Sequence, residues 1–173
     1  LAVLFAAIAA QAIAADRRPA SAAGTVAIID RFAPGGDTGW DLLAFDQTGN
    51  RLFVSRGTHV QVLDGNSGKL VGDITGTDGV HGIALAPEAK KGFTSNGKSD
   101  DVTEFDLASL KILKRILLHG KKPDTILYDP ASRHVLVFNG DSHNVSVIDP
   151  ATDREVTTIA LPGQPELAAA DGQ

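Results

Sequence analysis

The stretch WDLLAFD at residues 40–46 has two counterparts further along the chain, VHGIALA at 80–86 and PDTILYD at 123–129. The copies lie 40 and 43 residues apart. In each copy a polar residue at the second position is followed by a mainly apolar run. Apolar residues at consecutive positions are typical of a strand that is buried on both faces. The chain is therefore predicted to contain a repeat that begins with a buried strand.

Three further β-patterned runs follow each copy at matching offsets. The second run contains an aromatic or aliphatic core and ends in glycine, the third ends in aspartate, and the fourth ends in isoleucine. The second runs are 51–57, 91–97 and 134–140, the third runs are 60–64, 102–106 and 145–149, and the fourth runs are 70–74, 112–116 and 155–159. Turn residues such as Asn96-Gly97 and Asn139-Gly140 separate the runs, as expected for hairpins.

Four strands in every ~40–45 residues is the period of a propeller blade. We therefore predict an all-β fold, namely a β-propeller of four-stranded antiparallel blades. Complete blades are expected at residues 40–79, 80–122 and 123–164, and residues 165–173 are expected to begin a further blade.

Residues 25–33 match the fourth run of the repeat and predict a lone outer strand ahead of the first blade. Such a strand completes the last blade of a closed ring and so removes an exposed sheet edge. A closed ring needs at least four blades. The sequence therefore predicts an incomplete ring that belongs to a longer parent chain.

Residues 1–14 are apolar and uncharged, and they end in the small-x-small pattern Ala12-Ile13-Ala14. This pattern is typical of a secretory signal peptide, here clipped at its N-terminus, and residues 15–24 have the composition of a linker. The apolar run is too short to anchor the mature chain in a membrane. A buried alanine-rich helix is the alternative interpretation. We predict a periplasmic or secreted protein.

The composition excludes several functions. A net charge of −5 disfavours nucleic acid as a partner, because such binding needs a basic face. The absence of cysteine excludes disulfides, thiolate nucleophiles, iron–sulfur clusters and c-type haem attachment. The sequence also lacks a Gly-x-Ser-x-Gly elbow, a phosphate loop and a dinucleotide fingerprint.

The second runs resemble the Tyr-Val-Thr-Asn motif that names the bacterial, exported YVTN-repeat β-propeller family. The resembling segments are Phe53-Val-Ser-Arg56, Phe93-Thr-Ser-Asn-Gly97 and Leu136-Val-Phe-Asn-Gly140, and Arg56 departs from the asparagine of the motif. The resemblance covers residues 25–173. It implies a secreted or periplasmic seven-bladed propeller, and because the functions of this family are mixed it does not imply an activity.

The position just before each innermost strand carries a potential ligand. These residues are Asp41, His81, Asp124 and Glu166. Equivalent positions of successive blades lie around one end of the central channel, so we predict a ligand-binding site at the channel mouth. The four groups could hold a divalent cation or a polar ligand, or act in acid–base chemistry. The alternative is that they face water or cap local turns.

Other recurrent residues have simpler interpretations. The aspartates that end the third runs are expected to accept backbone N–H groups in the following turns. Trp40 is expected to pack against a loop, with stacking on a ligand as the alternative. The segments Thr75–Val80 and Leu117–Pro123 are predicted to be loops of a binding face.

These features together favour a binding or scaffold module for a protein, a cell-surface component or a small molecule. The alternative is a propeller enzyme of the lactonase or dehydrogenase type with a metal or cofactor at the channel mouth. A divalent cation is the only cofactor that the residues suggest.

Overall fold

A computed structural model describes residues 27–36 and 39–171, and these residues form an all-β fold. The chain divides into two compact units, Leu1–Arg31 and Phe32–Gln173, and the strands of the described residues lie in the second. The strands are β1 (Leu43–Asp46), β2 (Arg51–Ser55), β3 (Gly57–Asp64), β4 (Leu70–Ala86), β5 (Lys91–Asn96), β6 (Asp101–Asp106), β7 (Ile112–Leu117), β8 (Pro123–Asp129), β9 (His134–Asn139), β10 (Asn144–Asp149) and β11 (Arg154–Ala160). A single 3-10 turn, η1 (Pro87–Ala89), separates β4 from β5.

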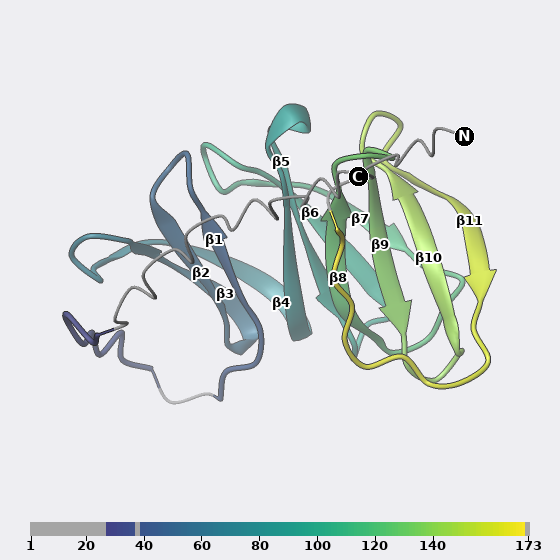
Figure 1. The fold of residues 1–173 in the computed structure, drawn as a ribbon, viewed down its shortest axis with the longest axis horizontal. Helices are drawn as coiled ribbons and strands as arrows, with labels where there is room; N and C mark the ends of the chain where they lie inside the picture. Colours follow the sequence, from purple (N-terminus) through teal and green to yellow (C-terminus); the bar gives the residue numbers. More distant parts are fainter. Residues whose placement is uncertain (1–26, 37–38, 172–173) are drawn as a thin grey trace, which may run out of the picture. The chain divides into compact units, whose positions relative to one another are not determined.

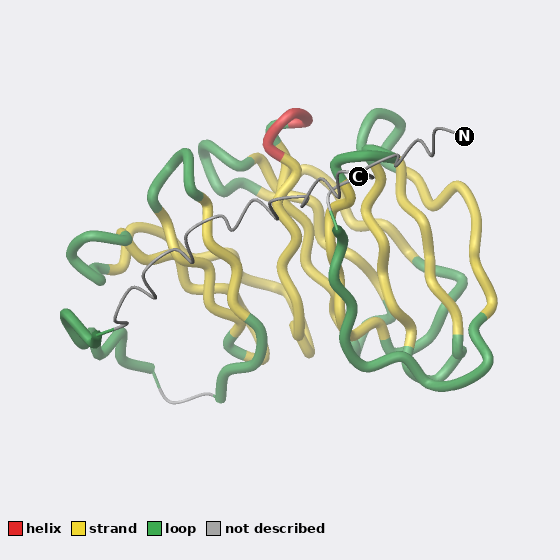
Figure 2. Tube along the Cα trace, viewed as in Figure 1, coloured by secondary structure: helices red, strands yellow, loops and turns green. Residues whose placement is uncertain are grey.

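Consecutive strands pair antiparallel except β7 and β8, which gives two open sheets (Figures 1 and 2). The first sheet has the order β1-β2-β3-β4-β5-β6-β7, and the second has the order β11-β10-β9-β8. Within the described residues, no helix is long and apolar enough to cross a bilayer. The predicted signal peptide at 1–14 and linker at 15–24 lie outside the described residues.

Strand β4 belongs to two successive repeats. Its first half pairs with β3 through Val60 and Ile74, and its second half pairs with β5 through Ala84 and Phe93. The chain therefore contains three four-stranded meanders: β1 to the first half of β4, the second half of β4 to β7, and β8 to β11. We call these the first, second and third meander.

The predicted loop at Thr75–Val80 is wrong, because this segment lies inside β4. Gly76 and Gly79 have φ values of 74° and 72°, which allow the chain to change direction without leaving the sheet. The predicted loop at Leu117–Pro123 is confirmed for residues 118–122, which connect β7 to β8. Two predicted strand segments are absent, since residues 27–33 and 165–171 form no strand.

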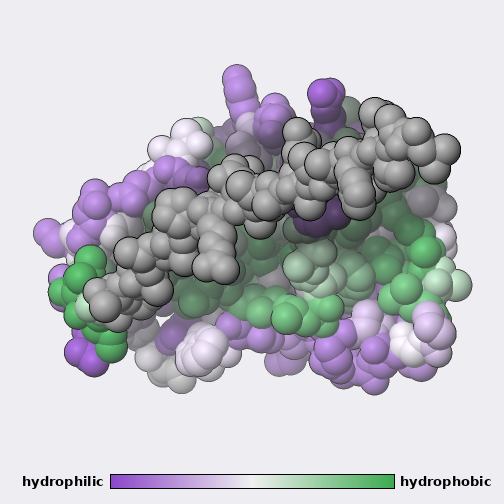
Figure 3. Space-filling view, in the orientation of Figure 1, coloured by the Kyte–Doolittle hydropathy of each residue, from purple (hydrophilic) through white to green (hydrophobic). Residues whose placement is uncertain are grey.

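Apolar clusters lie between adjacent meanders. Phe53 of the first meander stacks on Phe105 of the second, with ring centroids 5.9 Å apart. Phe93 of the second meander packs in a cluster with Val135 and Ile148 of the third. All five side chains are fully buried. In the view of Figure 3, hydrophobic residues gather across the middle of the face and hydrophilic residues along its lower rim. Each meander therefore buries apolar surface against the next.

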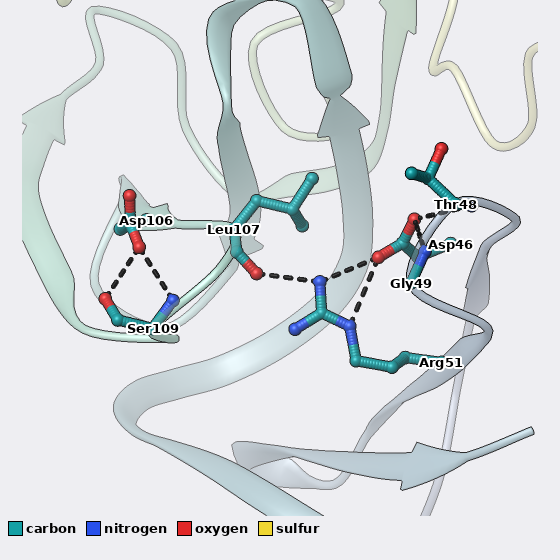
Figure 4. Close-up of polar contacts among 7 residues, drawn as sticks. All are labelled: Asp46, Thr48, Gly49, Arg51, Asp106, Leu107 and Ser109. Carbon is teal, nitrogen blue, oxygen red and sulfur yellow. Dashed lines mark hydrogen bonds and ion pairs between the residues drawn. The ribbon is translucent and has the colours of Figure 1, made fainter.

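In the first two meanders, the basic side chain that begins the second strand reaches to the following meander. Arg51 lies between the Asp46 carboxylate and the Leu107 carbonyl oxygen, donating to both at 2.7 Å (Figure 4). Lys91, one repeat later, donates to the Pro150 carbonyl oxygen at 2.8 Å. These bonds repeat with the sequence and support the apolar contact between meanders.

The predicted turn aspartates are confirmed. The Asp106 carboxylate accepts hydrogen bonds from the Ser109 hydroxyl at 2.6 Å and from the Ser109 N–H at 2.7 Å. The Ser109 hydroxyl, with help from the backbone N–H, lowers the pKa of Asp106. The same turn, with a serine or threonine three residues after the aspartate and a lowered pKa, recurs at Asp64, Asp129 and Asp149.

We expect acid to destabilise the protein through these turns. A carboxylate whose pKa is lowered by folding stabilises the folded state above its unfolded pKa, here near 3.8, and the contribution is lost as the pH falls through the folded pKa. Replacing Asp106 and Asp149 together by asparagine is expected to flatten the acid side of the stability profile. Melting temperatures followed by circular dichroism from about pH 7 to about pH 2 measure this effect. Parallel profiles for the two proteins would contradict it.

Phe93→Ala is expected to destabilise the protein by about 3–5 kcal/mol, because it empties a buried ring site between two meanders. Urea unfolding measures the loss. Leu117→Ala is the control, since Leu117 is 76% exposed and its truncation is expected to cost less than about 0.5 kcal/mol. Equal losses in the two variants would show that the cluster does not stabilise the fold.

Candidate functional site

Three of the four residues predicted at the channel mouth lie together. Asp41, His81 and Asp124 each offer a potential ligand atom, and these atoms lie within 4.8 Å of one another. Asp41 precedes β1, His81 lies in the second half of β4, and Asp124 is the second residue of β8. Each residue therefore comes from the first strand of a different meander, or from the residues just before it.

The Ser55 hydroxyl holds Asp41 in place. It accepts a hydrogen bond from the Asp41 N–H at 3.1 Å and donates to the Leu42 carbonyl oxygen at 3.0 Å. The Leu42 N–H in turn donates to the carbonyl oxygen of His81 at 3.2 Å. The backbone next to Asp41 is thus hydrogen-bonded to the backbone of His81.

The Ser95 hydroxyl has the same role one repeat later. It accepts from the Gly82 N–H at 2.9 Å and donates to the carbonyl oxygen of Asp124. A third connection runs from the Thr125 hydroxyl to the carbonyl oxygen of Glu166. The Leu42 and Ser95 bonds link the starts of successive first strands, and the Thr125 bond extends the series to the segment that follows β11. Residues that align in the sequence therefore lie side by side.

The side chains of Asp41 and His81 form a close polar pair. His81 Nδ1 lies 2.7 Å from Asp41 Oδ2, which is a hydrogen-bond distance. A carboxylate bonded to one ring nitrogen also fixes the orientation of the imidazole, as is common around metal ligands. The pair is partly exposed to solvent.

Asp124 is the more buried carboxylate of the cluster. Burial raises its pKa, and the charges of Asp41 and Glu166 raise it further against the opposing charge of His81. Glu166 is exposed and lies outside the group of converging ligand atoms. The predicted convergence is therefore found for three residues, and ligand binding by any of them stays a prediction.

A cavity of about 270 Å³ opens beside the cluster. Its lining residues are Gly39, Trp40, Asp41, Gly57, Gly79, Val80, His81 and Lys98. Trp40 is 72% exposed, so the prediction that it packs against a loop is wrong.

Sequence reasoning missed Lys98, because the equivalent positions in the other repeats are Thr58 and Asp141 and carry no common chemistry. The position of Lys98 nevertheless follows from the pairing of β4 with β5. Val80 pairs with Asn96, so Lys98, two residues beyond Asn96, lies at the strand end that carries His81.

A larger cavity of about 690 Å³ lies near η1 and the turns after β8 and β10, away from these residues. Its Lys91 is already engaged by Asp153, by the buried Glu104 at 3.0 Å and by Pro150. We place the candidate site at the smaller cavity, because there the side chains of successive repeats converge.

One imidazole and two carboxylates form a nitrogen and oxygen ligand set. Such a set suits Zn²⁺ and similar divalent ions, and three protein ligands leave a coordination position open for a further molecule. Ligand atoms within 4.8 Å of one another can contact one cation after side-chain rotations. The residues present therefore fit a divalent cation.

The backbone at Gly97 sets the position of the His81 ring. A Cβ atom at Gly97 would lie 2.8 Å from His81 Nε2 and 2.9 Å from His81 Cδ2, closer than real contacts allow. Glycine at this position therefore lets the imidazole approach Asp41 and Asp124.

Comparison with known proteins identifies the fold and no family. No family model and no curated protein matches the chain. Among solved structures the chain is similar to hydrazine synthase of Kuenenia stuttgartiensis, with a TM-score of 0.69 and 20% sequence identity over 80% of this chain. The match spans 40% of that protein. At this identity the similarity concerns the fold alone.

We expect Gly97→Ala to displace the His81 ring and to break its hydrogen bond with Asp41, since the added methyl group would occupy the space of the imidazole. The ¹⁵N chemical shifts of the His81 ring measure the change. Gly140→Ala is the matched control at the same position of the next repeat, where the nearest atom to the added Cβ is 3.5 Å away. Unchanged His81 shifts in Gly97→Ala would contradict the expected displacement.

Proposed function

We propose that this chain is part of a β-propeller of the YVTN-repeat kind, and that it acts as a binding module with a divalent-cation site formed by Asp41, His81 and Asp124. The observation that carries the proposal is the convergence of these three repeat-equivalent groups within 4.8 Å. In the propeller, this site lies at the mouth of the channel that the first strands surround.

Three features support the propeller. Each meander has four antiparallel strands, apolar clusters lie between adjacent meanders, and hydrogen bonds join the starts of successive first strands. The three meanders are its blades. The apolar N-terminal stretch supports export, so we place the protein in the periplasm or outside the cell.

A binding role is favoured because the site is built from rigid strand ends, while an exposed cavity beside it is open to a partner. The partner is a small molecule, a protein or a cell-surface component. One observation favours the enzyme alternative of the lactonase or dehydrogenase type. Three protein ligands leave a position at the cation where a substrate oxygen could be polarised.

The test is calorimetric titration of the protein with Zn²⁺, Mg²⁺ and Ca²⁺. We expect Zn²⁺ to bind most tightly because the set contains an imidazole. Asp124→Ala is expected to weaken binding by more than about 100-fold, since loss of an outer-shell partner alone costs about 10- to 100-fold. Asp141→Ala, which removes an exposed carboxylate elsewhere, is expected to bind like the wild type. Absence of binding, or equal binding by wild type and Asp124→Ala, would refute the cation site.

A further inference from the structure

The Lys98 ammonium is uncommitted. Within residues 27–36 and 39–171 it makes neither a hydrogen bond nor an ion pair, and it lines the cavity beside Asp41 and His81. The stem of the side chain lies against Gly79, where an added Cβ would be 2.7 Å from Lys98 Cγ. The close contact with Gly79 keeps the first carbons of the Lys98 side chain at the rim of the cavity.

Trp40 gives the same cavity an apolar aromatic surface, and this residue is 72% exposed. A large exposed aromatic side chain beside a cavity is a usual contact for the apolar part of a ligand. Three glycines, Gly39, Gly57 and Gly79, line the cavity with backbone only, which leaves room next to the indole.

We propose that this cavity binds a small organic carboxylate with an apolar body, an inference that rests on the cation site proposed above. One carboxylate oxygen takes the open position on the cation, the other accepts a hydrogen bond from the Lys98 ammonium, and the apolar body lies against Trp40. The site residues and the cavity are continuous, because Asp41 and His81 belong to both.

The charges specify a monoanion. The carboxylates of Asp41 and Asp124 would balance the two charges of a divalent cation bound between them, and an imidazole ligand adds no charge. Lys98 is then the cationic side chain that lines the cavity and is left to pair with a ligand. A single carboxylate on the ligand would neutralise the charge of Lys98. Charge-assisted hydrogen bonds to such groups are among the stronger ones. The volume of about 270 Å³ lies just below the usual range for drug-sized ligands, about 300–1,000 Å³, which favours a small molecule.

The chain contains a single tryptophan, so its fluorescence reports directly on this cavity. We suggest titrating the Zn²⁺-saturated protein with phenylacetate and, separately, with its neutral analogue phenylacetamide. The expected result is a saturable change in Trp40 emission with phenylacetate, and an affinity for phenylacetamide that is at least about tenfold lower. Lys98→Gln is expected to lose a similar factor, because it replaces the ammonium by a neutral polar amide on a side chain only one atom shorter.

Lys111→Gln is the matched control, since Lys111 is an exposed lysine on another part of the second meander and outside the cavity. Binding of Zn²⁺ without any phenylacetate response, or equal affinity for the two analogues, would overturn the carboxylate proposal and leave the cation site standing. Unchanged phenylacetate affinity in Lys98→Gln would also overturn it. Failure of the wild type to bind Zn²⁺ in calorimetry would instead refute the proposed function itself.

Discussion

Burial of one meander against the next is the interaction on which the rest of the structure depends. A four-stranded antiparallel sheet of this size has two faces, and it is not stable with both in water. Phe53 and Phe93 occupy equivalent positions and are fully buried at successive contacts between meanders. Because these contacts set the spacing of the meanders, they also set the spacing of the first strands, and with it the distance between the candidate ligands.

Two serine hydroxyls hold the backbone at the site in place. Ser55 and Ser95 each accept from the backbone of one first-strand segment and donate to a carbonyl oxygen, and the Ser95 bond crosses to the next meander. They align in the sequence as the third residue of the Phe-x-Ser pattern. These serines lie in the segments that resemble the Tyr-Val-Thr-Asn motif, and their role is structural. The candidate ligand residues lie outside those segments.

The sequence predicted the strands, the aspartate turns and three converging site residues, because all of them repeat. Repetition also misled at the two ends, since residues 27–33 and 165–171 form no strand and Glu166 lies outside the cluster. Features that do not repeat were missed or misjudged. The segment Thr75–Val80 was expected to be a loop, but it lies within β4, where Gly76 and Gly79 have positive φ values. Trp40 was expected to be covered and is exposed, and Lys98 has no chemical counterpart at Thr58 or Asp141. Sequence periodicity identifies equivalent positions. It does not predict a cavity whose lining residues differ from one repeat to the next.

Each meander contributes a single side chain to the proposed cation site, and this arrangement has an evolutionary consequence. A coordination sphere built from repeats is modular, so a mutation in one copy exchanges one ligand and leaves the others in position. His81 stands where its neighbours Asp41 and Asp124 have carboxylates, and this one difference changes an all-oxygen set into one that contains nitrogen. Preference among cations in such a protein could therefore diverge by one codon at a time, without any change in the scaffold.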